Sequence, residues 1–331
     1  MFVYVSLLGQ GDGTADDRPI ALANIGAVDP TSAFIWTDNT ITATDLVTLN
    51  TYASGTVILS NVTLVTGSAA EVAQAYNSTG ITGLGNEPVT LSGTTAAASD
   101  LNSIDTDTSG TIDASSVMLV TGTIIAVTTA LQSTGITGLT NSALDLSNTS
   151  ATASSLNTLN GLTTGVVNAA LVNSLLGSAA DVAAAYAANG LGEITGLGNE
   201  SVNLFMGSAA AADMVAINAR TSGAVNSSSV STITGAAADV AAVYAGISGF
   251  SGLGNEAVTL DAGSAAATAL NSINLGTSGT IDASTVTTLT GTAANVRTAL
   301  QATGIAGLGN ENVTLNDTSL AASDLNALNG L

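Results

Sequence analysis

The sequence predicts an α/β solenoid with a leucine-rich-repeat-like architecture, built from about ten stacked coils of roughly 27–28 residues each. Each coil is expected to contribute one short parallel strand and one short helix. Three observations predict this fold class: two phrases recur at a fixed period, each half-period holds an extended segment before a helical one, and small side chains dominate. One such unit cannot bury its apolar face alone, whereas stacked neighbours can.

The phrase GLGNE sets the period. It begins at Gly83, Gly196, Gly252 and Gly307, and its variant GLTNS begins at Gly138, so that each copy follows the last after roughly 55–58 residues. A second phrase, SGTIDAS and its variants, divides each of these double repeats into two half-units. Its glycine stands at Gly55, Gly110, Gly165, Gly223 and Gly279.

The first kind of half-unit begins with GLGNE and continues into a strand, which the residues Val313, Thr314 and Leu315 illustrate. A helix should follow, because Ala321, Leu325 and Leu328 are spaced i, i+4 and i+7 and therefore share one helical face.

The second kind of half-unit begins with SGTIDAS. Ile281, Val286 and Leu289 are expected in extended segments, and a helix should start at about Ala293. Helix starts are also signalled in the other copies of this half-unit. Ser68-Ala-Ala-Glu71 is a capping box and Ser178-Ala-Ala-Asp181 is its shorter-armed version, after which Val182 and Tyr186 should face inward.

The leucine-rich consensus itself is absent, since the asparagine here precedes the strand. We therefore divide the chain into residues 41–331, which form the repeat solenoid, and residues 1–40, which do not repeat and are expected to form an N-terminal cap or exchange segment.

The repeats resemble those of a known kind of protein. The phrases GLGNEAVTL, LAASDLNALNG, SGTIDAS and LTGTAANV are similar to the tandem repeats of very large, acidic, cell-surface or secreted proteins of marine cyanobacteria. Some of these are labelled hemolysin-type calcium-binding proteins, but the glycine-aspartate nonapeptides that would justify the label are missing here. The resemblance, which covers roughly residues 40–331, implies an extracellular or cell-surface structural setting.

The charge balance excludes several partners. There are 24 acidic residues against three arginines, with no lysine and no histidine, which gives a net charge of -21. Binding to nucleic acid or to an anionic membrane surface requires clustered Lys and Arg, so neither is expected. There is no cysteine, so disulfides and thiolate metal sites are absent. No apolar run is long enough to cross a bilayer.

One copy of the second phrase is reminiscent of a calcium loop. In DTDTSGTIDASS the residues Asp105, Asp107 and Asp113 occupy the first, third and ninth positions, and Gly110 occupies the sixth. The other copies lose the acidic residues, and Ser116 stands where a calcium loop needs a glutamate. We favour a corner, in which the glycine takes a special backbone angle and the ninth residue caps a turn, with a weak calcium site as the alternative.

The string GLGNEA at Gly252 fits a dinucleotide fingerprint, but such a fingerprint follows a strand and opens a helix, whereas here a helix precedes and a strand follows. We interpret it as a turn. The asparagine of the phrase recurs in alternate coils and could form a structural ladder that bonds the backbone of the turns. Its members are Asn86, Asn141, Asn199, Asn255 and Asn310.

The neighbouring glutamates are expected to form surface rows that bind divalent cations only opportunistically. They are Glu87, Glu200, Glu256 and Glu311. Sequons such as Asn199-Glu-Ser201 and Asn312-Val-Thr314 leave glycosylation open.

No enzyme and no cofactor are expected, because the chain lacks the histidine, cysteine and lysine that nucleophilic catalysis and phosphate binding require. We expect a structural subunit of an extracellular filament or surface layer that assembles head to tail with its own copies, residues 1–40 docking on the C-terminal coil of the next copy. The alternatives are a calcium-dependent adhesin repeat module from a giant surface protein, and an ice- or carbohydrate-binding solenoid that uses aligned threonines such as Thr259 and Thr314.

Overall fold

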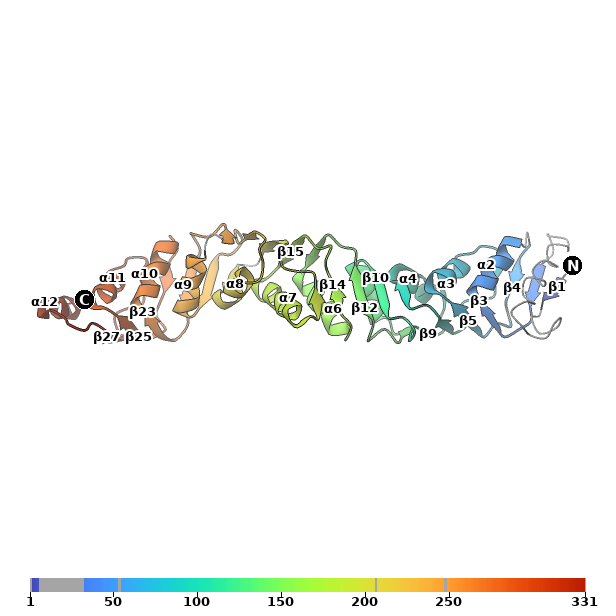
Figure 1. Ribbon diagram of the computed structural model, residues 1–331, viewed down its shortest axis with the longest axis horizontal. Coiled ribbons are helices and arrows are strands. Elements are labelled where there is room, and N and C mark those ends of the chain that lie inside the picture. The colour runs from blue at the N-terminus through green and yellow to red at the C-terminus, as the bar shows by residue number, and fades with distance from the viewer. Residues whose placement is uncertain (1, 6–32, 53–54, 206, 247–248, 331) are drawn as a thin grey trace. The chain divides into compact units, whose positions relative to one another are not determined.

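A computed structural model describes residues 2–5, 33–52, 55–205, 207–246 and 249–330. It confirms the α/β solenoid: short parallel strands stack in sheets, and a helix follows in each half-unit (Figure 1). The chain forms two compact units. The first comprises residues 1–148 and 158–169, and the second comprises residues 149–157 and 170–331.

The strands of the first unit are β1 (Phe2–Val5), β2 (Ala33–Trp36), β3 (Thr40–Thr42), β4 (Val57–Ile58), β5 (Leu64–Gly67), β6 (Ile81–Thr82), β7 (Val89–Leu91), β8 (Thr95–Ala97), β9 (Ile112–Asp113), β10 (Leu119–Gly122), β11 (Ile136–Thr137), β12 (Ala143–Leu146) and β14 (Val167–Asn168). Its helices are α2 (Ala43–Tyr52), α3 (Ala69–Tyr76), α4 (Ala98–Asp107) and α5 (Ile124–Gln132). Helix α6 (Ala153–Leu162) contributes residues to both units.

The strands of the second unit are β13 (Ser150–Thr152), β15 (Ser174–Gly177), β16 (Ile194–Thr195), β17 (Ser201–Leu204), β18 (Ser208–Ala210), β19 (Val225–Asn226), β20 (Thr232–Gly235), β21 (Phe250–Ser251), β22 (Ala257–Leu260), β23 (Gly263–Ala266), β24 (Ile281–Asp282), β25 (Val286–Gly291), β26 (Ile305–Ala306) and β27 (Asn312–Leu315). Its helices are α7 (Ala179–Leu191), α8 (Ala211–Asn218), α9 (Ala237–Ala245), α10 (Ala267–Gly276), α11 (Ala293–Leu300) and α12 (Ala322–Asn329).

The elements expected from the two half-units are present. Strand β27 and helix α12 form the first kind of half-unit, while β24, β25 and α11 form the second. The capping box is complete, because the Ser68 side chain accepts a hydrogen bond from the backbone of Glu71 and the Glu71 side chain accepts one from the backbone of Ser68. Val182 and Tyr186 are buried, as their helical spacing predicts.

The turn of the solenoid is shorter than the sequence period. In the sheet β3-β5-β7-β9-β11, the numbers of hydrogen-bonded partners differ by only 23 or 24, as the series Ile41, Val65, Val89, Ile112 and Ile136 shows. The numbers of the first residues of helices α2 to α5 instead differ by 26 or 29. The expected length of roughly 27–28 residues is therefore the distance between equivalent positions of the repeat. The number of residues between hydrogen-bonded partners in adjacent strands is smaller.

This mismatch changes which segments pair. Within one sheet, β5 directly precedes a helix, β7 follows the phrase GLGNE, and β9 belongs to the phrase SGTIDAS. Each strand therefore lies beside a different part of the repeat. The stretch between paired residues is longer for Ser174 and Ser201, because it includes the 13-residue helix α7.

The core is a stack of small and medium apolar side chains. Inward-facing residues of the strands, such as Val65 and Val89, and of the helices, such as Leu101 and Ile104, are fully buried. At the N-terminal side, β1 and β2 pair in one sheet with β4 and β6, and Trp36 is buried. Residues 33–36 thus belong to the stack, while most of the expected cap, residues 6–32, lies outside the described residues.

Candidate functional site

Three of the four glutamates of the GLGNE phrase are buried, which corrects the expectation that they form surface rows, whereas Glu311 of the last copy is partly exposed. Glu87 is 2% exposed, and Glu200 and Glu256 are each 1% exposed. Each carboxylate folds back onto its own turn. One oxygen of Glu256, for example, accepts hydrogen bonds from the backbone N–H groups of Gly254 at 2.8 Å and Asn255 at 3.1 Å. These donors compensate the removal of the charge from water.

The other carboxylate oxygen of each glutamate accepts a hydrogen bond from a tyrosine of the preceding helix. The pairs are Tyr76 with Glu87, Tyr186 with Glu200 and Tyr244 with Glu256. Burial raises the pKa of all three phenols well above its ordinary value, and the hydrogen bond to the carboxylate raises it further. We call these the Tyr–Glu pairs.

Where the glutamate is missing, so is the tyrosine. In the GLTNS copy, Ser142 takes the place of the glutamate, and Leu131 takes the place of the tyrosine in helix α5. The buried Ser142 hydroxyl donates to the carbonyl of Val117 at 2.7 Å instead. The last copy differs again, since Leu300 stands in the tyrosine position while Glu311 still accepts from the N–H of Gly309.

The two repeated phrases interlock across neighbouring coils. The hydroxyl of Thr277 donates to the carbonyl of Glu256 at 2.7 Å, and the N–H of Ser278 donates to the carbonyl of Gly254 at 2.9 Å. A Cβ on Gly279 would collide with the same Glu256 carbonyl. The coils at Thr108, Thr163 and Thr221 repeat this arrangement.

The corner at Asp105–Ser116 is confirmed in part. Asp113 caps a turn, because its side chain accepts from the N–H of Ser115 at 3.0 Å, and this bond lowers the pKa of its carboxyl. The glycine was explained wrongly. Gly110 does not adopt a positive φ and is needed for its close approach to Glu87, whereas positive φ values occur in GLGNE, as at Gly83 (90°).

The three aspartates of the calcium candidate are divided between a helix and a strand. Asp105 lies within helix α4 and accepts from the hydroxyl of Ser133 at 2.8 Å, Asp107 ends the same helix, and Asp113 lies on strand β9. In the part of the chain that the structure describes, no three acidic residues form a group able to hold a metal ion.

The asparagine ladder is not a row of linked side chains. The backbone N–H groups of Asn86, Asn199 and Asn255 bind the neighbouring glutamates. The side chain of Asn141 accepts from the hydroxyl of Thr164 at 2.8 Å, and Asn310 lies exposed in the last copy of the turn. Side chains of other asparagines, at positions 102, 157 and 271, link consecutive helices instead.

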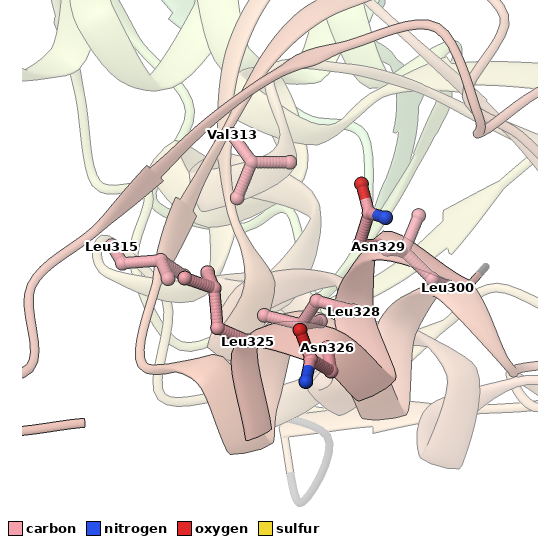
Figure 2. A pocket seen from close by; sticks show the side chains of 7 residues that line it. All are labelled: Leu300, Val313, Leu315, Leu325, Asn326, Leu328 and Asn329. Atoms are coloured by element: carbon pink, nitrogen blue, oxygen red, sulfur yellow. The ribbon is translucent and has the colours of Figure 1, made fainter. Parts of the chain in front are cut away.

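The last coil exposes an apolar face, which we call the end face. Val313 is 45% exposed and Leu325 is 53% exposed, although the equivalent Val258 and Leu270 are buried at 1% and 0%. Together with Leu315 and Leu328 they surround a hollow of about 500 Å³ (Figure 2). None of the described residues that line this hollow is charged. Its lining consists of Leu300, Val313, Leu315, Leu325, Asn326, Leu328 and Asn329.

Comparison with known proteins gives no family. No family model matches the sequence, and no curated protein is significantly similar to it. Among the helices that the structure describes, none has the length and apolar character that a membrane span requires.

Proposed function

We propose that this protein is a structural subunit of an extracellular filament or surface layer and that its copies join head to tail through the ends of the solenoid. The observation that carries the proposal is the end face. Side chains such as Leu325 are exposed there at positions that are buried in every preceding coil of the same kind. Fully burying one Leu or Val side chain contributes about 1.5–3 kcal/mol, so a partner coil would be bound favourably.

The chemistry of the chain supports a structural role. Its Thr-Ser-Gly turns fasten one coil to the next by binding backbone carbonyls, and the carboxylates of the Tyr–Glu pairs are buried. The acidic composition and the resemblance of the repeats to those of large surface proteins support an extracellular location.

The test is assembly of the purified full chain, followed by sedimentation velocity and negative-stain microscopy. We expect rods or sheets whose amount grows with protein concentration. A carboxylate in the end face should oppose this, so Leu325→Asp should raise the concentration needed for assembly at least tenfold.

The matched control is Ile125→Asp, which places the same charge at a residue that is 80% exposed and lies on helix α5 of the other compact unit. It should assemble as the unaltered chain does. If the unaltered chain remains monomeric at every concentration, or if both variants behave alike, the proposal is wrong.

A further inference from the structure

Side-chain amides link consecutive helices inside the solenoid. The Nδ2 of Asn102 donates to the carbonyl of Ala126 at 2.9 Å, and Asn157 and Asn271 donate in the same way to Asp181 and Asn295. In each case the acceptor is the third residue of the next helix. Asn326 holds the corresponding position in α12, is exposed, and lines the hollow of the end face.

Backbone groups of the GLGNE turn form a second set of contacts with the following coil. The Gly254 and Glu256 carbonyls accept from Ser278 and Thr277, while the N–H of Val258 donates to the carbonyl of Thr280 at 2.9 Å. The corresponding groups of the last coil are the carbonyls of Gly309 and Glu311 and the N–H of Val313. Helix α12 is the last element of the described chain.

From these contacts we propose that the end face is a selective docking site for one kind of polypeptide segment. This segment carries the phrase Thr-Ser/Thr-Gly, then a short strand, and then a helix, as residues 277–301 do. The Thr and Ser would bind the carbonyls of Glu311 and Gly309, the third residue of the helix would accept from Asn326, and the apolar residues would cover Val313 and Leu325. The inference goes beyond the proposed function, because the Thr-Ser/Thr-Gly turns of this chain already bind their own preceding coils and the docking segment would come from another polypeptide.

Selectivity follows from the glycine of the phrase. Gly279 lies against the carbonyl of Glu256, and any side chain there would collide with it. A segment that begins with GLGNE has no Thr-Ser-Gly turn and would leave the carbonyls of Gly309 and Glu311 without donors, which is unfavourable once they are buried. The two kinds of half-unit should therefore be distinguished at this face.

Thiol protection can test this in the full chain, which contains no cysteine. The thiol of the Leu325→Cys variant is exposed and should react rapidly with a maleimide. A synthetic peptide of residues 277–301 in excess should slow the reaction at least tenfold. The same peptide with Gly279→Val, and the matched GLGNE peptide of residues 252–276, should not slow it. Labelling of the Ile125→Cys variant should be unchanged by any peptide.

A free peptide must fold when it binds, which weakens its binding, so a second measurement uses a covalently attached segment. Residues 277–301 are fused directly after Leu331, which reproduces the order Leu162-Thr163-Thr164-Gly165 found inside the chain. In this extended chain the thiol of the Leu325→Cys variant should be protected, and the Gly279→Val substitution in the added segment should restore labelling.

Equal protection by all peptides, or an unprotected thiol in the extended chain, would overturn the inference. Its failure is distinguishable from failure of the proposed function. Assembly of copies without protection by the Thr-Ser-Gly segment would leave the filament proposal standing, whereas protection without any assembly of copies would leave only the docking site.

Discussion

The hydroxyl of Tyr244 donates a hydrogen bond to the buried carboxylate of Glu256, which follows it closely in the chain. The glutamate oxygen not used by the tyrosine holds the Gly254 and Asn255 N–H groups, so one side chain ties the end of helix α9 to the turn that precedes strand β22. The arrangement occurs three times, in both compact units, and places three carboxylates in the interior.

Removing the phenol oxygen should destabilise the fold locally. Tyr244→Phe leaves the Glu256 carboxylate without one of its donors, and the expected cost is about 1–3 kcal/mol of unfolding free energy. Urea unfolding followed by circular dichroism gives the loss, and hydrogen exchange at the Gly254 and Asn255 amides locates it. In the background of Glu256→Gln the same tyrosine change should cost less, because the two groups are coupled. An equal loss of unfolding free energy in both backgrounds would show that Tyr244 and Glu256 are not energetically coupled.

The GLTNS copy provides the reciprocal experiment. Ser142→Glu alone should be destabilising, because Leu131 cannot donate to the new carboxylate. Adding Leu131→Tyr should recover part of the lost stability. The prediction is wrong if the double variant is less stable than the single one.

The three paired tyrosines should resist alkaline titration in the folded protein. Because burial raises their pKa above the value of about 10 in an unfolded chain, the unfolded state loses its phenolic protons first as the pH rises. The free energy of unfolding should therefore be insensitive to these groups below about pH 10 and should fall as the pH rises further. Phenolate absorbance between pH 10 and 11 should show at least three of the five tyrosines still protonated, and all five should titrate normally in concentrated urea.

A methyl group at the glycine of the second phrase should weaken the contact between coils. Gly279→Ala drives a Cβ into the Glu256 carbonyl and should cost about 2 kcal/mol or more. The matched change, Gly161→Ala, has open space around it in helix α6 and should stabilise the protein by about 0.5–1 kcal/mol. Thermal or urea unfolding of the two variants should shift in opposite directions, and a shift in the same direction would contradict the assigned role of Gly279.

Assembly through the end face should be promoted by salt. The net charge of -21 makes copies repel one another, whereas the described residues that line the hollow are uncharged. Raising sodium chloride from about 10 mM to about 300 mM shortens the screening length several-fold and should lower the concentration needed for assembly. Leu325→Asp should remain unassembled at both salt concentrations, and light scattering measures both effects.

Removal of calcium should leave the fold unchanged. Asp105, Asp107 and Asp113 lie on a helix and a strand and do not form a metal-binding group. Far-ultraviolet circular dichroism should be the same in excess calcium and in excess chelator. A loss of helical signal in chelator would instead support the calcium-dependent adhesin alternative.

The sequence was sufficient for the local elements because their signals are local. The i, i+4 and i+7 spacing of Ala321, Leu325 and Leu328 locates a helical face, and the Ser68–Glu71 capping box marks the start of another helix. The stacking followed from the period, since a unit of this size must bury its apolar face against a neighbour.

The burial of the glutamates did not follow from the sequence, because Glu is ordinarily exposed and its donors are backbone groups that no residue type reveals. A usable signal was present, however. A tyrosine precedes the glutamate in three copies, and Leu131 accompanies Ser142 in another. The shorter turn was also hidden, because sequence comparison measures the distance between equivalent positions and not the length of chain that closes one coil.

The shorter turn has a consequence for what can be displayed on the strands. Threonines occupy aligned outward positions at Thr42, Thr66 and Thr90, but the next position in that row is Asp113. Residues that pair in a sheet are not equivalent positions of the repeat, because the paired positions are a few residues closer in the sequence than the equivalent ones. Adding another repeat therefore does not add another copy of the same row of side chains to that sheet. An ice lattice or a regular polysaccharide would therefore meet a changing sequence of chemical groups along any one sheet, and lengthening the protein would not by itself enlarge a uniform binding plane.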